Sequence, residues 1–209
     1  VNGSKGGDFS ELRAYMLSKL MWDPYQDVDS LMTTFLNGYY GKAGPYINNY
    51  LKMLEGALLS SGKELWIYDS AITHKDGMLN PQLVKTYNEI FDKAEAAVAD
   101  DAEKLRRVRL SRLSLMFSEL EIARTYNDMN IEDIKLKLDL LEKRTAEESV
   151  PAINERRNTP GEYCKLYRER FLPQQVKSKA LGSKVTWILP PHRKYQDLGE
   201  TALTDGLYG

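Results

Sequence analysis

The side chains best suited to nucleophilic catalysis are few and scattered in this sequence. His74 and His192 are its two histidines, and Cys164 is its single cysteine. His74 lies in a segment without helical periodicity, His192 lies near the end of the sequence, and Cys164 lies among apolar residues spaced as in a helix core. A triad needs a histidine beside a serine or cysteine, and a lone cysteine is most often a small buried hydrophobe. We therefore expect structural roles for all three residues.

Acidic residues could bind a metal or cleave a glycoside. Asp27 and Asp29 are spaced like the first ligands of a helix-loop-helix calcium site, but the turn glycine and the terminal glutamate do not follow in register. Helix capping explains both aspartates better. Carboxylates that cleave glycosides face each other across about 5 to 9 Å, and the spacing of these acidic residues indicates no such pair. The residues alone therefore identify no catalytic residue and leave activity unproven.

The strongest charge cluster is a basic run that could bind a carboxylate, a sulfate or a phosphate. Its members are Lys104, Arg106, Arg107, Arg109 and Arg112. Such a run points to all sides of a helix, and Asp100, Asp101 and Glu103 lie beside it. A solvated face or an ion-pair network is therefore the expected structure.

Aromatic residues are the more distinctive feature, because the chain holds 13 tyrosines and 3 tryptophans. Aromatic rings combine a large apolar face with a polar edge, which suits them to stacking against sugars as well as to packing. The candidate glycan-stacking residues are Trp22, Tyr25, Tyr39, Tyr40, Trp66 and Tyr68. The alternative is that most of them pack in the core or against a neighbouring domain.

The spacing of apolar residues predicts that residues 1–173 form an all-α domain, a bundle of about seven helices. The helices are expected to begin near Asp8, near Asp27 or Asp29, and at Pro45, Pro81, Asp101, Asn130 and Pro160. Asp23-Pro24 should end the first helix, and Gly41 and Gly44 should end the second. Between Ser60 and Asn80 the helical pattern fails, and we expect an extended linker.

The helix expected after Asp101 carries two apolar stripes. One stripe is Leu110, Leu113, Phe117 and Leu120, and the other is Leu105, Val108, Leu115 and Ile122. A helix that is apolar on two sides is buried on two sides. We therefore expect this helix at the centre of the bundle.

The sequence changes character after Pro173. Residues 174–184 are expected to be a linker, and Val185 to Leu189 is predicted to be a strand. The stretch 185–209 is too short to bury a β-core of its own. We interpret it as the start of a truncated β-module, which gives the chain a short, incomplete β-type tail.

Charge and composition exclude several broad classes of function. With 29 basic and 30 acidic residues, the formal net charge is −1. Such a chain has no long-range field to attract nucleic acid or an anionic membrane surface. Its single cysteine allows no intrachain disulfide. The sequence has no spanning-length apolar stretch, no signal-peptide core and no initiator methionine, and we interpret it as a segment of a larger protein.

Two stretches in the first part of the chain resemble a known family. The resemblance rests on the segment from Glu11 to Pro24, on Asp27 and Asp29, and on the segment from Phe35 to Ile47. They resemble the helical region that follows the catalytic barrel in a domain-of-unknown-function family of bacterial glycoside hydrolases. The runs from Asn80 to Asp101 and from Val108 to Leu113 are similar to the same family, so the resemblance covers about residues 8–126. These proteins are distantly similar to α-glucuronidases and β-hexosaminidases.

The resemblance implies a non-catalytic role, because the catalytic residues of such enzymes belong to a barrel upstream of Val1. In those relatives the helical region packs on the barrel and in some members forms the dimer interface. If the first helix is the last helix of the barrel, residues 8–22 belong to the barrel and Asp8 and Phe9 line the substrate rim. Asp8 would then either cap the helix or accept a hydrogen bond from a sugar hydroxyl, and we favour capping.

The tail has a resemblance of its own. The residues that carry this resemblance are Ala180 to Thr186, Pro190-Pro191, Tyr195 and Ala202 to Gly209. They resemble the first part of a coagulation-factor 5/8 type C, or discoidin-like, carbohydrate-binding module. In that fold the Asp-Gly step helps to shape a calcium loop, so the resemblance implies Asp205 as a candidate calcium ligand. No other cofactor is implied.

Together these observations predict a helical accessory region of a bacterial glycoside hydrolase that is secreted, periplasmic or on the outer surface. Its expected partners are the upstream barrel, the downstream carbohydrate-binding module and a polysaccharide or glycan, with neither nucleic acid nor membrane. Two alternatives remain open. The helical domain itself binds glycan through surface tyrosines and tryptophans, or it is a homodimerisation domain.

Overall fold

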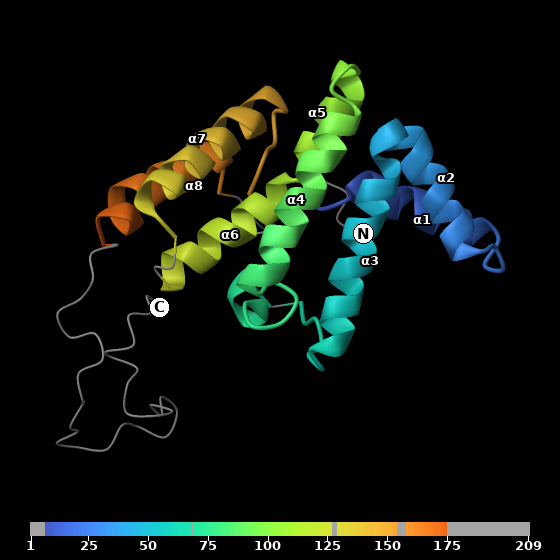
Figure 1. Cartoon of the computed structure of the whole chain (residues 1–209), viewed down its shortest axis with the longest axis horizontal. Helices are drawn as coiled ribbons and strands as arrows, with labels where there is room; N and C mark the ends of the chain where they lie inside the picture. Colours follow the sequence, from blue (N-terminus) through green and yellow to red (C-terminus); the bar gives the residue numbers. More distant parts are fainter. Residues whose placement is uncertain (1–6, 68, 127–128, 154–157, 175–209) are drawn as a thin grey trace.

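The computed structural model describes residues 7–67, 69–126, 129–153 and 158–174, and this part of the chain folds into helices joined by turns, without a β-strand (Figure 1). The prediction of an all-α fold is confirmed. The α-helices are α1 (Ser10–Trp22), α2 (Val28–Tyr40), α3 (Gly44–Ser60), α4 (Pro81–Ala97), α5 (Ala102–Ser111), α6 (Leu113–Tyr126), α7 (Ile131–Glu147) and α8 (Pro160–Leu166). The predicted tail of residues 185–209, with Asp205, lies outside the described residues.

The helix starts that were predicted from capping residues are confirmed. Side-chain oxygens of Asp27, Asn80, Asp101 and Asn130 accept hydrogen bonds from backbone N–H groups two or three residues further on. At α8, Thr159 and Glu162 form a reciprocal capping box. Each cap satisfies a donor that the first turn of a helix leaves without a partner.

The expected number of about seven helices is not confirmed, because the helix predicted after Asp101 is divided into α5 and α6. The division follows Ser111, whose hydroxyl donates a 3.1 Å hydrogen bond to the carbonyl of Arg107 and lies 2.7 Å from the hydroxyl of Tyr40. Serine side chains that bond back to the preceding turn bend helices. In Figure 1, α6 accordingly runs in a different direction from α5.

The extended linker predicted between Ser60 and Asn80 is wrong in its second half. Residues Ala71–His74 form a 3₁₀ turn that packs against α6. Ser70 and Thr73 cap this turn reciprocally, and His74 and Leu79 are buried. Local capping and burial of these two side chains make this stretch part of the folded domain.

Gly41 and Gly44 play different roles at the turn between α2 and α3. Gly41 has a φ of 57°, a left-handed value that glycine adopts without strain, and it ends α2 as predicted. Gly44, by contrast, is right-handed and is the first residue of α3. Its lack of a Cβ matters for packing, because a Cβ there would lie 2.8 Å from the carbonyl oxygen of Leu36.

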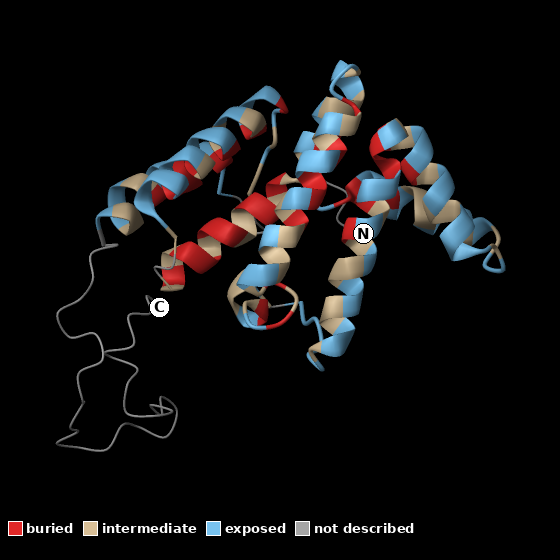
Figure 2. Cartoon of the chain, in the orientation of Figure 1, coloured by how far each residue is buried: buried red, intermediate tan, exposed pale blue. Residues whose placement is uncertain are grey.

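Two hydrophobic cores meet at α6. Leu115 and Ile122 belong to the first core, which α1 to α5 complete, whereas Leu113 and Leu120 belong to the second, which α7 and α8 complete. Figure 2 shows buried residues along most of α6. The two predicted stripes therefore face two cores, and the predicted central position of this segment is confirmed.

Candidate functional site

The start of α1 holds the two predicted substrate-rim residues, Asp8 and Phe9. Phe9 is buried with a φ of 46°, a left-handed value uncommon for a bulky residue. Its ring centroid lies 6.0 Å from that of Tyr50, so the side chain is anchored in the first core. Packing of this ring fixes the path by which the chain enters α1.

Asp8 does not cap α1, which corrects the preferred interpretation of this residue. The N-terminus of α1 has no side-chain cap, and the Asp8 carboxylate instead accepts a 2.8 Å hydrogen bond from the hydroxyl of Ser114 on α6. The residue retains solvent exposure, yet desolvation by surrounding protein atoms raises the pKa of its carboxyl. The hydrogen bond from Ser114 and the charge of Arg13 offset this rise only in part.

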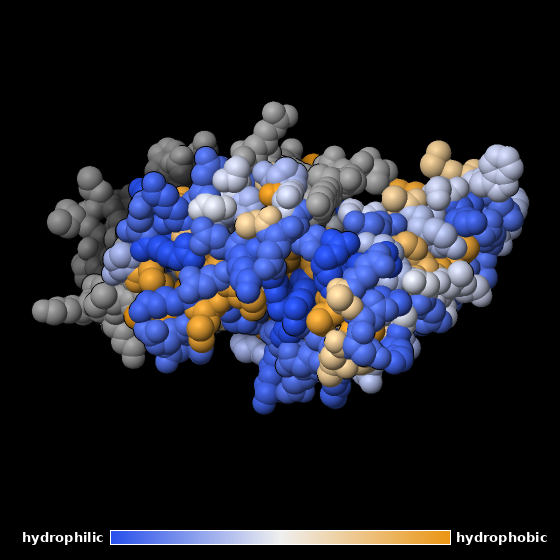
Figure 3. Space-filling model, turned by 90° about the horizontal axis from the view of Figure 1, so that it is seen from above, coloured by the Kyte–Doolittle hydropathy of each residue, from blue (hydrophilic) through white to orange (hydrophobic). Residues whose placement is uncertain are grey.

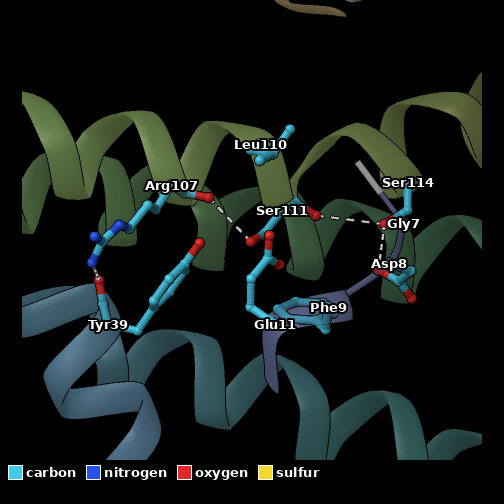
Figure 4. Close-up of a pocket in the computed structure, with 9 residues that line it drawn as sticks. All are labelled: Gly7, Asp8, Phe9, Glu11, Tyr39, Arg107, Leu110, Ser111 and Ser114. Atoms are coloured by element: carbon cyan, nitrogen blue, oxygen red, sulfur yellow. Dashed lines mark hydrogen bonds between the residues drawn. The ribbon is translucent and has the colours of Figure 1, made fainter. Parts of the chain in front are cut away.

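A small cavity lies between the start of α1 and α5 (Figure 4). Its volume is about 10 Å³, room for about one water molecule. Its lining residues are Gly7, Asp8, Phe9, Glu11, Tyr39, Arg107, Leu110, Ser111 and Ser114. Figure 4 shows the side chains of Glu11 and Tyr39 pointing into the space beneath α5. The described residues thus leave no room for a sugar ring here, and a substrate-rim role for Asp8 and Phe9 stays a prediction.

The candidate glycan-stacking residues separate into exposed and packed groups. Trp22, Tyr25 and Trp66 are 89%, 95% and 66% exposed. Tyr39 is half-buried, with its ring stacked on Phe35 at 5.0 Å and the Arg107 guanidinium 4.2 Å from its centroid. Tyr40 is 2% exposed, and Tyr68 lies outside the described residues. Among the described members of this set, Trp22, Tyr25 and Trp66 are the rings that are mostly exposed.

Trp22 and Tyr25 belong to a group of exposed apolar residues in α1, in the turn after it and at the start of α2, which we call the α1–α2 end. It consists of Leu17, Met21, Trp22, Tyr25 and Val28. In Figure 3, apolar and pale residues are visible at the extremity of the molecule that α1 and α2 form. The segment that follows α3 and contains Trp66 lies away from this extremity (Figure 1). Concentrated exposed apolar residues on a folded domain mark an interaction surface.

Sequence reasoning missed the aliphatic part of this surface. On α1, Leu12 and Met16 pack on the first core and mark the buried side of the helix. Leu17 and Met21 are one turn apart on another side of the helix. Their i,i+4 spacing, outside the core stripe, was a signal that could have identified a second apolar face.

The basic run forms an ion-pair network, as expected. Lys104 pairs with Asp101, Arg107 with Glu103, Arg106 with Glu148 at 2.5 Å, Arg109 with Glu95 at 2.9 Å and Arg112 with Asp92 at 2.7 Å. Since each cation already has a carboxylate partner, the run offers no ready site for an external anion. The sequence could not reveal the distant partners, Glu95 on α4 and Glu148 directly after α7.

The described nucleophile candidates have structural partners. His74 is buried, with its Nε2 3.0 Å from a carboxylate oxygen of Asp69. Cys164 is fully buried in the second core, where burial raises the pKa of its thiol to about 11. A thiol with such a pKa is protonated at neutral pH and a poor nucleophile. His192 lies outside the described residues.

For the acidic residues at the start of α2, the sequence offers two roles, as calcium ligands and as helix caps. The predicted capping role is confirmed for Asp27, which caps α2, but not for Asp29, which lies in the first turn of α2 and 3.4 Å from the ammonium of Lys52. Among the residues described, no three His, Cys, Asp or Glu side chains are grouped so that they could hold a metal ion. No helix in the same part of the chain is long and apolar enough to span a membrane.

Comparison with known proteins identifies one similarity. Residues 1–52 match the model of a family described as a domain of unknown function (DUF4838). This stretch contains α1, α2 and the first half of α3, and it includes the whole α1–α2 end. The predicted relationship to a domain of unknown function is confirmed for this part of the chain. No curated protein and no solved structure matches the chain.

Proposed function

We propose that this chain is a non-catalytic helical accessory region of a secreted bacterial glycoside hydrolase. In this proposal it packs against the catalytic barrel that precedes it and connects that barrel to a carbohydrate-binding module. The observation that carries the proposal is the α1–α2 end, where Met21, Trp22 and Tyr25 are each more than four-fifths exposed.

The composition of this surface fits a contact between domains. Tyrosine, tryptophan and methionine are enriched in the cores of protein interfaces, and tryptophan and tyrosine supply much of their binding energy. Apolar surface left in water costs about 25 cal/mol per Å², so covering these side chains stabilises the assembly. The α1–α2 end lies within residues 1–52, the stretch that matches the model of a family of unknown function.

The non-catalytic part of the proposal has its own support. The cavity beside Asp8 has room for about one water molecule, and the buried His74 and Cys164 already have structural partners. Asp8 and Glu11 are the carboxylates that line this cavity, and Asp8 already accepts a hydrogen bond from Ser114.

A paired assay tests this proposal. This chain and a longer product of the same gene that includes the sequence before Val1 are screened against polysaccharides and aryl glycosides. We expect cleavage only by the longer protein. Cleavage by this chain alone would overturn the non-catalytic role, and inactivity of both proteins on every substrate would remove the glycoside hydrolase assignment.

The second candidate function is glycan binding by the helical domain itself. Trp22 and Tyr25 are exposed three residues apart, and the Asp23 carboxylate between them accepts a 3.1 Å hydrogen bond from the Tyr25 N–H. Affinity electrophoresis in gels containing polysaccharide tests this role with the variants Trp22→Ala and Tyr25→Ala. If the domain binds glycan, both variants lose retardation, whereas Trp66→Ala on the other exposed ring serves as the matched control.

The same exposed surface could also pair with its counterpart in a second copy of the chain. Homodimerisation therefore remains the third candidate, and sedimentation velocity over a range of concentrations distinguishes it. A concentration-dependent dimer that Trp22→Ser abolishes would favour this role over packing on a barrel.

A further inference from the structure

A larger pocket lies between α4 and α6, away from the α1–α2 end. Its volume is about 350 Å³, within the range of small-molecule sites in proteins, which is about 300 to 1,000 Å³. Lys75, Asp76 and Leu79 from the turn after His74, and Met129 before α7, also line it. The pocket is therefore large enough for a small ligand, unlike the cavity beside Asp8.

The walls of this pocket are mainly apolar. The apolar lining residues include Leu79, Val84, Ile122, Tyr126 and Met129. Leu79 and Ile122 are buried members of the first core, so the wall is held by rigid packing. An apolar wall of this kind favours a hydrocarbon chain or an aromatic ring over a sugar, whose hydroxyl groups would lose their hydrogen bonds to water.

Glu119 is a buried polar residue in the lining of the pocket, and its side chain is 8% exposed. One of its oxygens accepts a 3.0 Å hydrogen bond from Asn88, and the other lies 3.0 Å from the ammonium of Lys137. The buried negative charge is thus already compensated. A cationic ligand would gain little from this carboxylate.

The mouth of the pocket carries two lysines and one aspartate, Lys75, Lys85 and Asp76. Lys75 lies 2.6 Å from the carboxylate of Asp76 and 4.3 Å from the centroid of the Tyr126 ring. Lys85 also lines the pocket, is exposed, and makes no ion pair with the residues that the structure describes. Glu119 and Asp76 are each paired with a lysine, so among the described residues of the lining Lys85 is the cation without a carboxylate partner.

We propose that this pocket binds a small amphipathic anion, an aliphatic or aromatic body that ends in a carboxylate. The apolar body lies against Val84 and Ile122, and the carboxylate pairs with Lys85. Burial of the body supplies most of the affinity, and the ion pair at the partly exposed mouth adds a smaller contribution. This binding activity is independent of the accessory role proposed above.

Titration with decanoate, below its micelle concentration, tests the proposal on the unmodified chain by methyl NMR. We expect saturable shifts that concentrate on the methyl groups of Leu79, Val84 and Ile122. Decyltrimethylammonium, which has the same chain length and the opposite charge, should bind several-fold more weakly. Shifts spread evenly over the surface, or equal affinity for the cation, would overturn the proposal.

Three variants locate the site by calorimetry. Lys85→Gln should weaken decanoate binding several-fold, whereas Lys93→Gln, a change on the same helix outside the pocket, should leave it unchanged. Ile122→Trp should fill the pocket and abolish binding. If Ile122→Trp does not fold, Val84→Phe on the more exposed wall replaces it. Unchanged affinity in Lys85→Gln or in the folded pocket-filling variant would contradict the assignment.

Discussion

The guanidinium of Arg112, in the turn between α5 and α6, lies 3.0 Å from the carboxylate of Glu95 on α4. Glu95 also accepts a 2.9 Å hydrogen bond from Arg109 and lies 3.7 Å from Arg144 on α7. Because α4 belongs to the first core and α7 to the second, this one carboxylate links the two halves of the domain.

Replacing Glu95 should therefore destabilise the whole domain. Glu95→Ala removes the carboxylate that three guanidinium groups share. Two of these groups, on Arg112 and Arg144, are largely buried. Removing one partner of a buried ion pair costs about 3 to 5 kcal/mol, and partial solvent exposure of this cluster reduces the expected loss to about 2 kcal/mol. Urea unfolding measures the change.

The matched control is Glu132→Ala, which removes an exposed carboxylate paired with Lys135 on α7. Exposed pairs contribute little, so the free energy of unfolding should change by less than about 0.5 kcal/mol. Equal losses in the two variants would contradict the linking role of Glu95.

Two glycines of α3 should respond to alanine in opposite directions. A Cβ on Gly44 would meet the backbone oxygen of Leu36 at 2.8 Å, whereas a Cβ on Gly56 would meet nothing within 4 Å. Gly44→Ala should therefore lower the free energy of unfolding by about 1 to 3 kcal/mol. Gly56→Ala should raise it by about 0.5 to 1 kcal/mol, because alanine favours the helix. Thermal unfolding of both variants checks the opposite signs.

The thiol of Cys164 should be protected in the folded protein. Its burial raises its pKa to about 11, so the reactive thiolate is rare at pH 8. We expect no labelling by a disulfide reagent under native conditions and complete labelling in urea. Rapid labelling of the native protein would show that the second core opens readily.

Acid should destabilise the domain through its helix caps. Hydrogen bonds from the side chain and backbone of Ser30 lower the pKa of Asp27, and bonds from the backbone and side chain of Thr159 lower that of Glu162. A carboxyl whose pKa is lowered in the folded state stabilises the fold at pH values above its unfolded-state pKa of about 4. This stabilisation is lost as the pH falls through the pKa of the folded state. The free energy of unfolding should therefore fall between about pH 5 and pH 3.

The variant Asp27→Asn isolates one part of this pH dependence. Asparagine caps helices about as well as aspartate but does not titrate. The variant should therefore be close to the parent in stability at low pH and show a shallower loss between neutral and acidic pH. A pH profile identical to that of the parent would indicate that the Asp27 cap does not contribute.

Local chemistry explains why most of the fold could be predicted from the sequence. Asn80, Asp101 and Asn130 cap helices through bonds to residues two or three positions away, and a single sequence displays such signals directly. The two stripes around Leu115 and Leu120 likewise follow from helical periodicity. These features depend on neighbours along the chain.

The features that could not be predicted depend on distant residues. The division of α5 from α6 involves Ser111 and Tyr40, which are 71 positions apart. The contact between Asp8 and Ser114 spans 106 positions, and local spacing therefore suggested a helix cap in its place. Aromatic content alone could not separate the packed Tyr40 from the exposed Tyr25, because burial is decided by the assembled helices.

The most direct test of the central claim is the exposure of Trp22 with and without the preceding part of the gene product. Acrylamide quenching is measured in a chain whose other two tryptophans are replaced, as Trp66→Phe and Trp187→Phe. Trp22 is 89% exposed in this chain, so its fluorescence should be readily quenched. If the α1–α2 end packs on a catalytic barrel, quenching in the longer protein should fall several-fold. Equal quenching in both proteins would contradict the proposed packing.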